Sequence, residues 1–299
     1  MIKNNTKTKT MKIIAIIPAY NEEETVARVI KDTLSYANEV IVINDGSRDA
    51  TEEVAESAGA DIIDNIVNRG LGETIKKGYD EALKRDADII VQLDADGQYL
   101  AKEIPLLIQP ILNNEADLVL GSRFENIRYK MPTLKRFGNK AFSFVLRILT
   151  GADVTDGQTG FRAIRRQVLE MAMPANKYTY TQEMIIKTAK EGWRIKSVPI
   201  TFVQRVSGES RLITNPLSYA WRGWTIIIRT LRDYHPLTFF GTAGVLFILS
   251  GVALGIALTY KFAVTGWIGR TPSVILTALL IMTGVQLLFM GLMADMMRK

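Results

Sequence analysis

Two aspartates one residue apart, Asp94 and Asp96, follow directly on a short apolar run at residues 89–93. Such a run is typical of a strand buried on both faces, and the side chains that follow it lie at the ligand-binding edge of a parallel sheet. The two carboxylates offer hard oxygen ligands to Mg2+ or Mn2+, and the side-chain carbonyl of Gln98 adds a third candidate ligand. The same spacing also occurs in solvated turns, so its meaning depends on the rest of the chain.

The composition limits the chemistry that is open to the chain. Its 299 residues include no cysteine and a single histidine, His235, which excludes disulfides, cysteine-ligated zinc and histidine clusters and makes a Ser-His-Asp triad implausible. Any bound metal must therefore be held by oxygen. The net charge of +6 reflects a mild excess of 37 basic over 31 acidic residues. Because the basic residues concentrate beside the apolar C-terminal segments, we expect contact with lipid and no nucleic-acid partner.

Short apolar runs alternate with helix-length amphipathic segments through the first two thirds of the chain. This alternation predicts an α/β domain over residues 11–212 with a mostly parallel, doubly wound sheet. The polar residues 1–10 before it are predicted to be a disordered tail. Strands are expected at residues 13–17, 40–43, 61–66, 89–93 and 118–120.

Two more polar clusters, at residues 18–22 and 44–49, follow the first two predicted strands. Together with Asp94 they come to one edge of the predicted sheet, where a loop and a carboxylate can hold the base and ribose of a nucleotide. Within these clusters, Asn21 is expected to cap a helix that begins at the next residue, and Asp49 a helix that runs to residue 58. Three polar clusters at successive strand ends favour a ligand site over three unrelated turns.

The C-terminal part of the chain has the pattern of a membrane protein. Residues 237–260 and 271–294 carry no charge and are each long enough to cross a hydrocarbon layer of about 30 Å, so residues 236–299 predict a transmembrane hairpin. Residues 213–235 place Trp beside Arg at helical spacing, as in an amphipathic interfacial helix. Basic residues flank the hairpin at both ends, which predicts a multi-pass protein of the cell membrane with a cytoplasmic catalytic domain. A homo-oligomer formed through the transmembrane helices is also open.

One more segment carries both apolar and basic side chains at helical spacing. Residues 133–150 predict either a basic amphipathic helix or an ordinary surface helix that faces the core.

Seven motifs occur within residues 12–212: Pro18-x-Tyr20-Asn21-Glu22, Asn44-Asp45-Gly46-Ser47-x-Asp49, Asn68-x-Gly70-x-Gly72, Asp94-Ala95-Asp96-Gly97-Gln98, Gly121-Ser122-Arg123, Asp156-x-x-Thr159-Gly160-Phe161-Arg162 and Arg205-x-x-Gly208-x-Ser210. In this order and spacing they resemble the inverting glycosyltransferases of family 2 with fold type A (GT-A). Within that family the resemblance is to the dolichyl-phosphate, or polyprenyl-phosphate, mannose synthase branch. Asn44 stands where many members carry an aspartate, and Thr159 where serine is usual.

The resemblance implies transfer of a hexose, with inversion, from GDP-mannose, UDP-glucose or UDP-GlcNAc to dolichyl or polyprenyl phosphate, giving a lipid-phosphate sugar for glycan or glycoprotein assembly. It implies that Asp94, Asp96 and Arg123 are catalytic and that Mg2+ or Mn2+ binds Asp96, Gln98 and Asp94. Guanidinium groups suit phosphates because they form two parallel hydrogen bonds. The expected substrate-binding residues are Pro18, Tyr20, Glu22, Ile43, Asp45, Asp94, Ala95, Asp96, Arg123, Arg136, Arg205 and Arg211.

Two other functions remain open. One is a processive membrane polysaccharide or glycolipid synthase, although chains of that class have more spans and a Gln-x-x-Arg-Trp motif that this sequence lacks. The other is a catalytically silent membrane scaffold, against which the intact Asp94, Asp96 and Gln98 argue. A Rossmann dehydrogenase is disfavoured because Gly70-x-Gly72 lacks the third glycine of the dinucleotide motif.

Overall fold

The chain forms two compact units, Met1–Pro216 and Leu217–Lys299. The computed structural model describes residues 11–127, 133–174, 180–205, 235–267 and 271–297, and positions 225, 228, 229 and 232, without the side chains of residues 125–127 and 133–135. The predicted tail, most of the predicted interfacial helix, and Arg211 lie outside the described residues.

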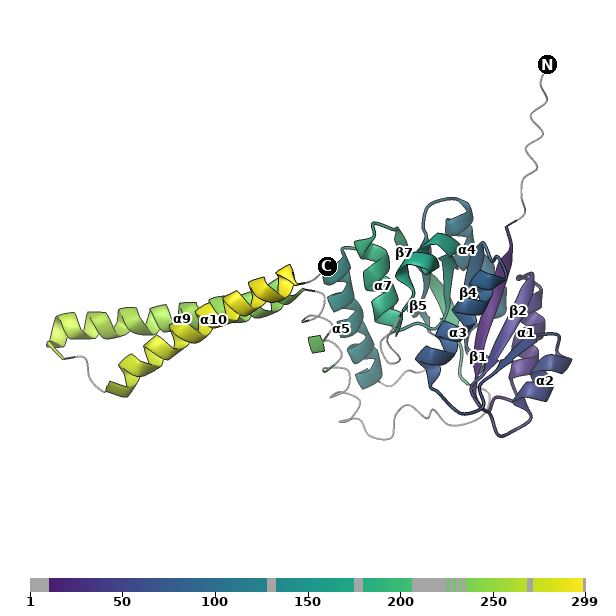
Figure 1. Cartoon of the computed structure of the whole chain (residues 1–299), viewed down its shortest axis with the longest axis horizontal. Helices are drawn as coiled ribbons and strands as arrows, with labels where there is room; N and C mark the ends of the chain where they lie inside the picture. The colour runs from purple at the N-terminus through teal and green to yellow at the C-terminus, as the bar shows by residue number, and fades with distance from the viewer. Residues whose placement is uncertain are drawn as a thin grey trace, which may run out of the picture. The chain divides into compact units, whose positions relative to one another are not determined.

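The first unit is built on a mostly parallel sheet whose described strands have the order β3-β2-β1-β4-β6-β5-β7 (Figure 1). Among them only β6 is antiparallel, and it is so to both of its neighbours. The mostly parallel α/β sheet was predicted, whereas β6 and β7 were not. The strands are β1 (Ile13–Ala19), β2 (Glu39–Asn44), β3 (Asp61–Asp64), β4 (Ile89–Gln92), β5 (Leu118–Ile127), β6 (Arg162–Arg165) and β7 (Ile195–Phe202).

Helices cover both faces of the sheet, as a doubly wound fold requires (Figure 1). Ala15 and Ile17 of β1 join Val29 in one buried core, whereas Ile16 faces Gly78 on the other side of the sheet. Successive side chains of a strand point to opposite faces, which explains why β1 is apolar throughout. The helices are α1 (Val26–Leu34), α2 (Thr51–Ser57), α3 (Leu71–Lys84), α4 (Ile104–Leu112), α5 (Thr133–Thr150), α6 (Arg166–Ala172) and α7 (Tyr180–Lys190), with a short 3-10 turn at Ala101–Glu103.

Helix α1 begins later than predicted, at Val26, and Asn21 does not cap it. Asn21 has a φ of 54°, in the left-handed region that asparagine tolerates, and its side-chain oxygen accepts the Arg48 backbone N–H at 2.8 Å. Asn21 therefore joins the loop after β1 to the loop after β2. Helix α2 begins at Thr51, whose backbone N–H donates to the Asp49 carboxylate at 3.1 Å.

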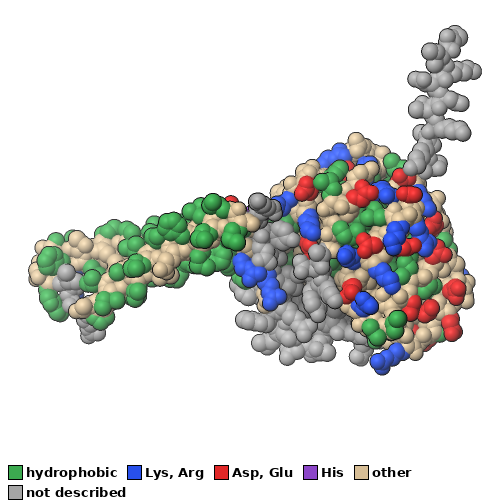
Figure 2. Space-filling model, in the orientation of Figure 1, with side chains coloured by type: hydrophobic (Ala, Val, Ile, Leu, Met, Phe, Trp, Pro, Cys, Tyr) green, Lys and Arg blue, Asp and Glu red, His purple; other side chains and the backbone are tan. Residues whose placement is uncertain are grey.

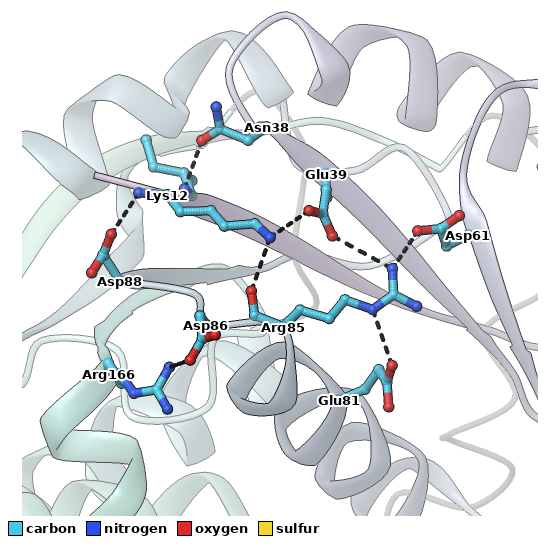
Figure 3. A network of polar contacts seen from close by, with 10 residues as sticks. Lys12, Asn38, Glu39, Asp61, Glu81, Arg85, Asp86, Asp88 and Arg166 are labelled. Atoms are coloured by element: carbon cyan, nitrogen blue, oxygen red, sulfur yellow. Dashed lines mark hydrogen bonds and ion pairs between the residues drawn. The ribbon is translucent and has the colours of Figure 1, made fainter. Parts of the chain in front are cut away.

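The amino edge of the sheet carries a network of charged side chains (Figure 3). Arg85 pairs with Asp61 and, at 3.4 Å, with Glu39, whose other oxygen pairs with Lys12 Nζ at 2.6 Å. The Lys12 backbone N–H donates to Asp88 at 2.8 Å. These contacts join the starts of β1, β2, β3 and β4, although partly exposed ion pairs typically contribute only about 0–1 kcal/mol each. The amino edge is thus occupied by structural contacts, whereas the described motifs lie toward the opposite edge.

The second unit contains two described helices that are long and apolar enough to cross a membrane, α9 (Pro236–Thr265) and α10 (Thr271–Met296). Both helices carry many exposed large hydrophobic side chains, several of which are seen on the face that Figure 2 shows. Helix α9 continues past residue 260, where the predicted span ended, and so includes Lys261. The helices pack through buried glycines spaced seven residues apart in each, which are Gly244 and Gly251 in α9 and Gly284 and Gly291 in α10. A Cβ atom on Gly284 would lie 2.6 Å from the Gly244 carbonyl oxygen, so the backbones approach as closely as glycine allows.

We expect Gly284→Ala to push α9 and α10 apart, whereas Gly241→Ala, whose new Cβ would meet no atom closer than 3.9 Å, leaves them in place. Helix–helix distances range from about 8 to 10 Å with the side chains at the contact, so the expected displacement is about 1–2 Å. The chain has no cysteine, so spin labels can be attached selectively at Cys replacements of the exposed Val245 and Val285. An unchanged label distance in Gly284→Ala would contradict glycine-mediated packing.

Candidate active site

The carboxyl ends of β1, β2 and β4 surround a pocket on the sheet edge opposite the charged network. These strands are parallel neighbours in the order β2-β1-β4, so the segments that leave them converge at this edge. The pocket is lined by Pro18, Ala19, Tyr20, Glu22, Asp45, Leu71, Thr74, Asp94, Ala95 and Asp96. The three polar clusters singled out in the sequence therefore come together, as residues that follow adjacent parallel strands must.

The position of Asp94 depends on a glycine in the facing segment. A Cβ atom on Gly160 would lie 2.7 and 2.9 Å from the two Asp94 carboxylate oxygens, which is closer than real Cβ contacts come. The Gly160 backbone N–H in turn donates to the Tyr99 hydroxyl at 3.0 Å. The Asp96 carboxylate accepts the Gln98 backbone N–H at 3.1 Å. Both aspartates are thus oriented by neighbouring groups and remain partly accessible from the pocket.

The pocket is electrostatically unfavourable for negative charge. Removal from water and the negative charge of Asp96 together raise the pKa of Asp94 to about 7, although the charges of Arg123 and Arg162 oppose them. Desolvation also raises the pKa of Glu22, although Arg205 pairs with it. A cation bound beside these carboxylates would favour their ionised forms.

The residues present fit a divalent metal that arrives with its substrate. Within the described part of the chain, no three acidic, histidine or cysteine side chains are grouped closely enough to hold a metal by themselves. Mg2+ commonly needs only one or two carboxylates together with substrate phosphates, and Asp94 and Asp96 can supply these. The Gln98 side-chain amide donates to the Val203 carbonyl at 3.0 Å, which fixes the amide group of the third expected ligand.

Asp45 holds the loop that leads into α3. Its carboxylate accepts hydrogen bonds from the Asn65 side chain at 3.0 Å and from the backbone N–H groups of Arg69 and Gly70 at 2.9 and 3.0 Å. This loop delivers Leu71 to the pocket. Asp45 therefore shapes the pocket wall as well as lining it.

Two residues beside Asp45 point away from the pocket. Asn44 donates to Asp64 at 2.7 Å and to Glu52 at 3.2 Å, so an aspartate at position 44 would bring three carboxylates together. The two carboxylate neighbours thus explain why position 44 carries an asparagine and not an aspartate. Ile43 is fully buried and packs against Gly78, so its side chain does not line the pocket as a substrate-binding residue.

The predicted phosphate-binding arginines are in different situations. Arg123 is buried and forms a two-pronged ion pair with Asp156, and Arg205 pairs with Glu22. Arg136 is exposed on α5 and does not line the pocket, and Arg211 is outside the described residues.

The sequence analysis did not assign a role to Asp156 or to Arg162. Arg162 is fully buried, its guanidinium donates to the Thr159 carbonyl and lies 5.7 Å from the Tyr180 ring centroid, and it makes no ion pair within the described residues. Both residues belong to one of the seven motifs, and that motif was the available sign that they matter. It also contains Thr159, whose carbonyl is the acceptor that the buried Arg162 needs.

The fold and the pocket define an α/β enzyme with a nucleotide-type binding edge, and the comparisons give its family. Residues 14–171 match the family model described as glycosyl transferase family 2, and the chain belongs to this family of glycosyltransferases. Glycosyltransferase AglJ of Haloferax volcanii is 30% identical over 95% of this chain and 93% of its own length. An undecaprenyl-phosphate mannosyltransferase of Micrococcus luteus is 32% identical over 68% of this chain and 88% of its own.

A third relative supports this family, and a solved structure shares the fold. The UDP-N-acetylglucosamine–dolichyl-phosphate N-acetylglucosaminyltransferase of Methanococcus voltae is 33% identical over 63% of this chain and 84% of its own. Glucosyl-3-phosphoglycerate synthase from Mycobacterium tuberculosis, a structure 23% identical, matches 75% of this chain and 80% of its own with a TM-score of 0.60. At that identity the likeness shows the GT-A-like fold alone, as predicted.

The raised pKa of Asp94 predicts a pH-dependent gain in stability for Asp94→Asn in protein freed of metal with EDTA. The Asp94 carboxyl ionises near pH 4 in the unfolded chain and near pH 7 in the folded protein. Its ionisation therefore does not change the free energy of unfolding below about pH 4 and lowers it by the full amount above about pH 7. We therefore expect Asp94→Asn to leave the Tm unchanged at pH 4 and to raise it by a few degrees at pH 8. Thermal unfolding in detergent measures this, and a gain that does not grow with pH would contradict it.

Proposed function

We propose that this glycosyltransferase moves a single hexose, with inversion, from a nucleotide diphosphate sugar to a polyprenyl or dolichyl phosphate. GDP-mannose, UDP-glucose and UDP-GlcNAc are the candidate donors. The observation that carries the proposal is the pocket at the ends of β1, β2 and β4, where Asp94 and Asp96 meet the loop after β1 and Asp45. Relatives at 31–33% identity whose names specify undecaprenyl phosphate or dolichyl phosphate support this choice of acceptor.

In this proposal the donor lies along the pocket wall formed by Pro18, Tyr20 and Asp45, with its diphosphate toward Asp94 and Asp96. Mg2+ or Mn2+, held by Asp96 and Gln98 with Asp94 beside them, would neutralise the charge that grows on the leaving diphosphate. The raised pKa of Asp94 supports the need for a cation there. The fold neighbour glucosyl-3-phosphoglycerate synthase, crystallised in complex with Mn2+ and uridine-diphosphate-glucose, also supports it.

The acceptor phosphate needs steering more than deprotonation. A phosphate monoester has a second pKa of about 6 and is largely ionised at pH 7, so its oxygen can attack the anomeric carbon without an enzyme base. Arg123 and Arg205 are near the carboxylates of the pocket, since each affects the pKa of one of them. These guanidinium groups can hold the anion, with Arg136 and Arg211 as further proposed ligands.

The membrane is the proposed third partner. The two apolar helices α9 and α10 are suited to cross it, and the proposed topology places the catalytic unit in the cytoplasm. Helix α5 supports contact with a bilayer surface: Phe142 and Leu146 are buried against the protein, whereas Phe137, Phe144 and Ile148 are exposed, at 73%, 60% and 66%. Exposed aromatic and aliphatic side chains beside basic ones, here Arg136, Lys140 and Arg147, are typical of interfacial helices.

Metal dependence tests the donor site. We expect chelation to abolish transfer and Mn2+ or Mg2+ to restore it, and Asp96→Ala to lower kcat/KM by about 10²-fold or more, because such charge stabilisation contributes several kcal/mol. Asp32→Ala, at an exposed position of α1, is the control and should leave transfer unchanged. Full activity in excess chelator would rule out the assigned metal site.

The pH dependence tests the acceptor. We expect the rate with polyprenyl phosphate to rise with acceptor ionisation up to about pH 7 and then to flatten, because the nucleophile is then fully charged. An unphosphorylated prenol of the same length should give no product. Efficient transfer to that prenol, or a rate that climbs tenfold per pH unit well above 7, would show that an enzyme base acts instead.

A further inference from the structure

We propose that Asp156 is a positioning residue that orients the guanidinium of Arg123 for the acceptor phosphate. This inference rests on the proposed function, because it assigns Arg123 to one substrate of that reaction. Asp156 has no exposed surface, and Arg123 is 7% exposed. The pair lies at the edge of the sheet where β5 continues past its pairing with β6.

The Asp156 carboxylate is filled by hydrogen-bond donors. One oxygen accepts Arg123 Nε at 2.6 Å and the Arg123 backbone N–H at 3.3 Å. The other accepts Arg123 Nη2 at 3.0 Å and the Gln158 backbone N–H at 3.3 Å. An ionised carboxylate offers about four lone-pair positions, and four N–H groups occupy them. Asp156 therefore has no free oxygen position with which to act as a base toward the acceptor substrate. Its role is to hold the arginine side chain in place.

Holding Arg123 by one edge leaves its other edge for a ligand. Within the described residues, Arg123 Nη1 donates no hydrogen bond, and the guanidinium carbon lies 5.4 Å from the centroid of the Phe202 ring. The side chain is thus fixed along one edge by Asp156 and against one face by Phe202. The Phe202 ring packs against Tyr99, whose hydroxyl accepts the backbone N–H of Gly160 beside Asp94, so a chain of contacts joins Arg123 to the pocket. A guanidinium fixed in this way presents Nη1 to an anion without losing further side-chain freedom.

A buried ion pair can also serve stability alone, and the chain contains a matched pair for comparison. Asp117 is 4% exposed and accepts the Arg194 backbone N–H at 3.1 Å, Nε at 3.0 Å and Nη2 at 3.1 Å. The three contacts from a single arginine match those of the Asp156 pair, whereas Asp117 also accepts Arg165 Nε at 3.1 Å and Arg194 is half-exposed. Asp117 precedes the first residue of β5, at the amino edge of the sheet and away from the pocket.

The test compares Asp156→Asn, Asp117→Asn, Arg123→Gln and the double variant Arg123→Gln/Asp156→Asn in the full-length protein. Kinetics are measured with polyprenyl phosphate and with the nucleotide sugar as the varied substrate, and each variant's Tm is recorded. We expect Asp156→Asn to lower kcat/KM for polyprenyl phosphate by between about 10-fold and 10²-fold, since small misplacements of a positioning group have effects of this size. The KM for the nucleotide sugar should change less than twofold.

The control and the double variant separate the explanations. Asp117→Asn should lower the Tm to a similar extent but leave the acceptor kinetics unchanged, and the double variant should be no slower than Arg123→Gln. Equal acceptor losses in Asp156→Asn and Asp117→Asn would show a purely structural role. An added loss in the double variant would show that Asp156 acts independently of Arg123. Unchanged kinetics in Asp156→Asn would also overturn the inference.

Two further outcomes are informative. If Asp156→Asn does not fold, Arg123→Lys replaces it, because lysine keeps the charge but cannot bond both carboxylate oxygens as a planar fork. The same acceptor-selective loss is expected there, and unchanged kinetics would overturn the inference. Wild-type protein that fails to use polyprenyl phosphate at all would overturn the proposed function, and this inference with it, whereas active wild type isolates the question of Asp156.

Discussion

The carboxyl edge of the sheet gathers acidic and guanidinium groups that are largely withdrawn from water, and the site depends on how their charges are balanced. Removing an ion from water without a partner costs several kcal/mol. Asp156 is balanced by Arg123, and Glu22 by Arg205. Asp94 makes no ion pair within the described residues, and its pKa is raised accordingly. The edge thus fixes two arginines in ion pairs and leaves one carboxylate without a counter-ion, which suits the proposed cation site.

Advance fixing of charged groups is what a transfer between two anionic substrates requires. Both donor and acceptor carry phosphate, so the protein must hold them at reacting distance against their repulsion. Groups oriented before the substrates arrive do this without reorganisation during the reaction. Gly160 leaves room for Asp94, and Asp45 holds the loop before α3 through three hydrogen bonds. The glycine and the loop contacts are therefore as much part of the site as the groups that would touch substrate.

The sequence predicted the parallel part of the sheet, because strands that are buried on both faces appear as apolar runs. It also predicted that the polar clusters at the strand ends converge, because parallel strands place their carboxyl ends at one edge. It did not predict β6, whose four residues begin and end in arginine, or β7, which contains Lys196 and Pro199. Nor did it predict that Arg123 is paired, since its partner is 33 residues away and only the fold brings the two together. Ile43 was also predicted to bind substrate and stays a prediction, and its side chain packs against Gly78 of α3, which explains why this position is apolar.

The structure of the product tests the central claim most directly. Purified full-length protein, given a nucleotide sugar, a divalent metal and polyprenyl phosphate, should form a lipid-linked phosphodiester carrying one hexose. Its anomeric configuration, measured by NMR, should be opposite to that of the donor, because the acceptor oxygen attacks the face away from the leaving diphosphate. A retained configuration, or a lipid or polymer carrying several sugars, would contradict the account.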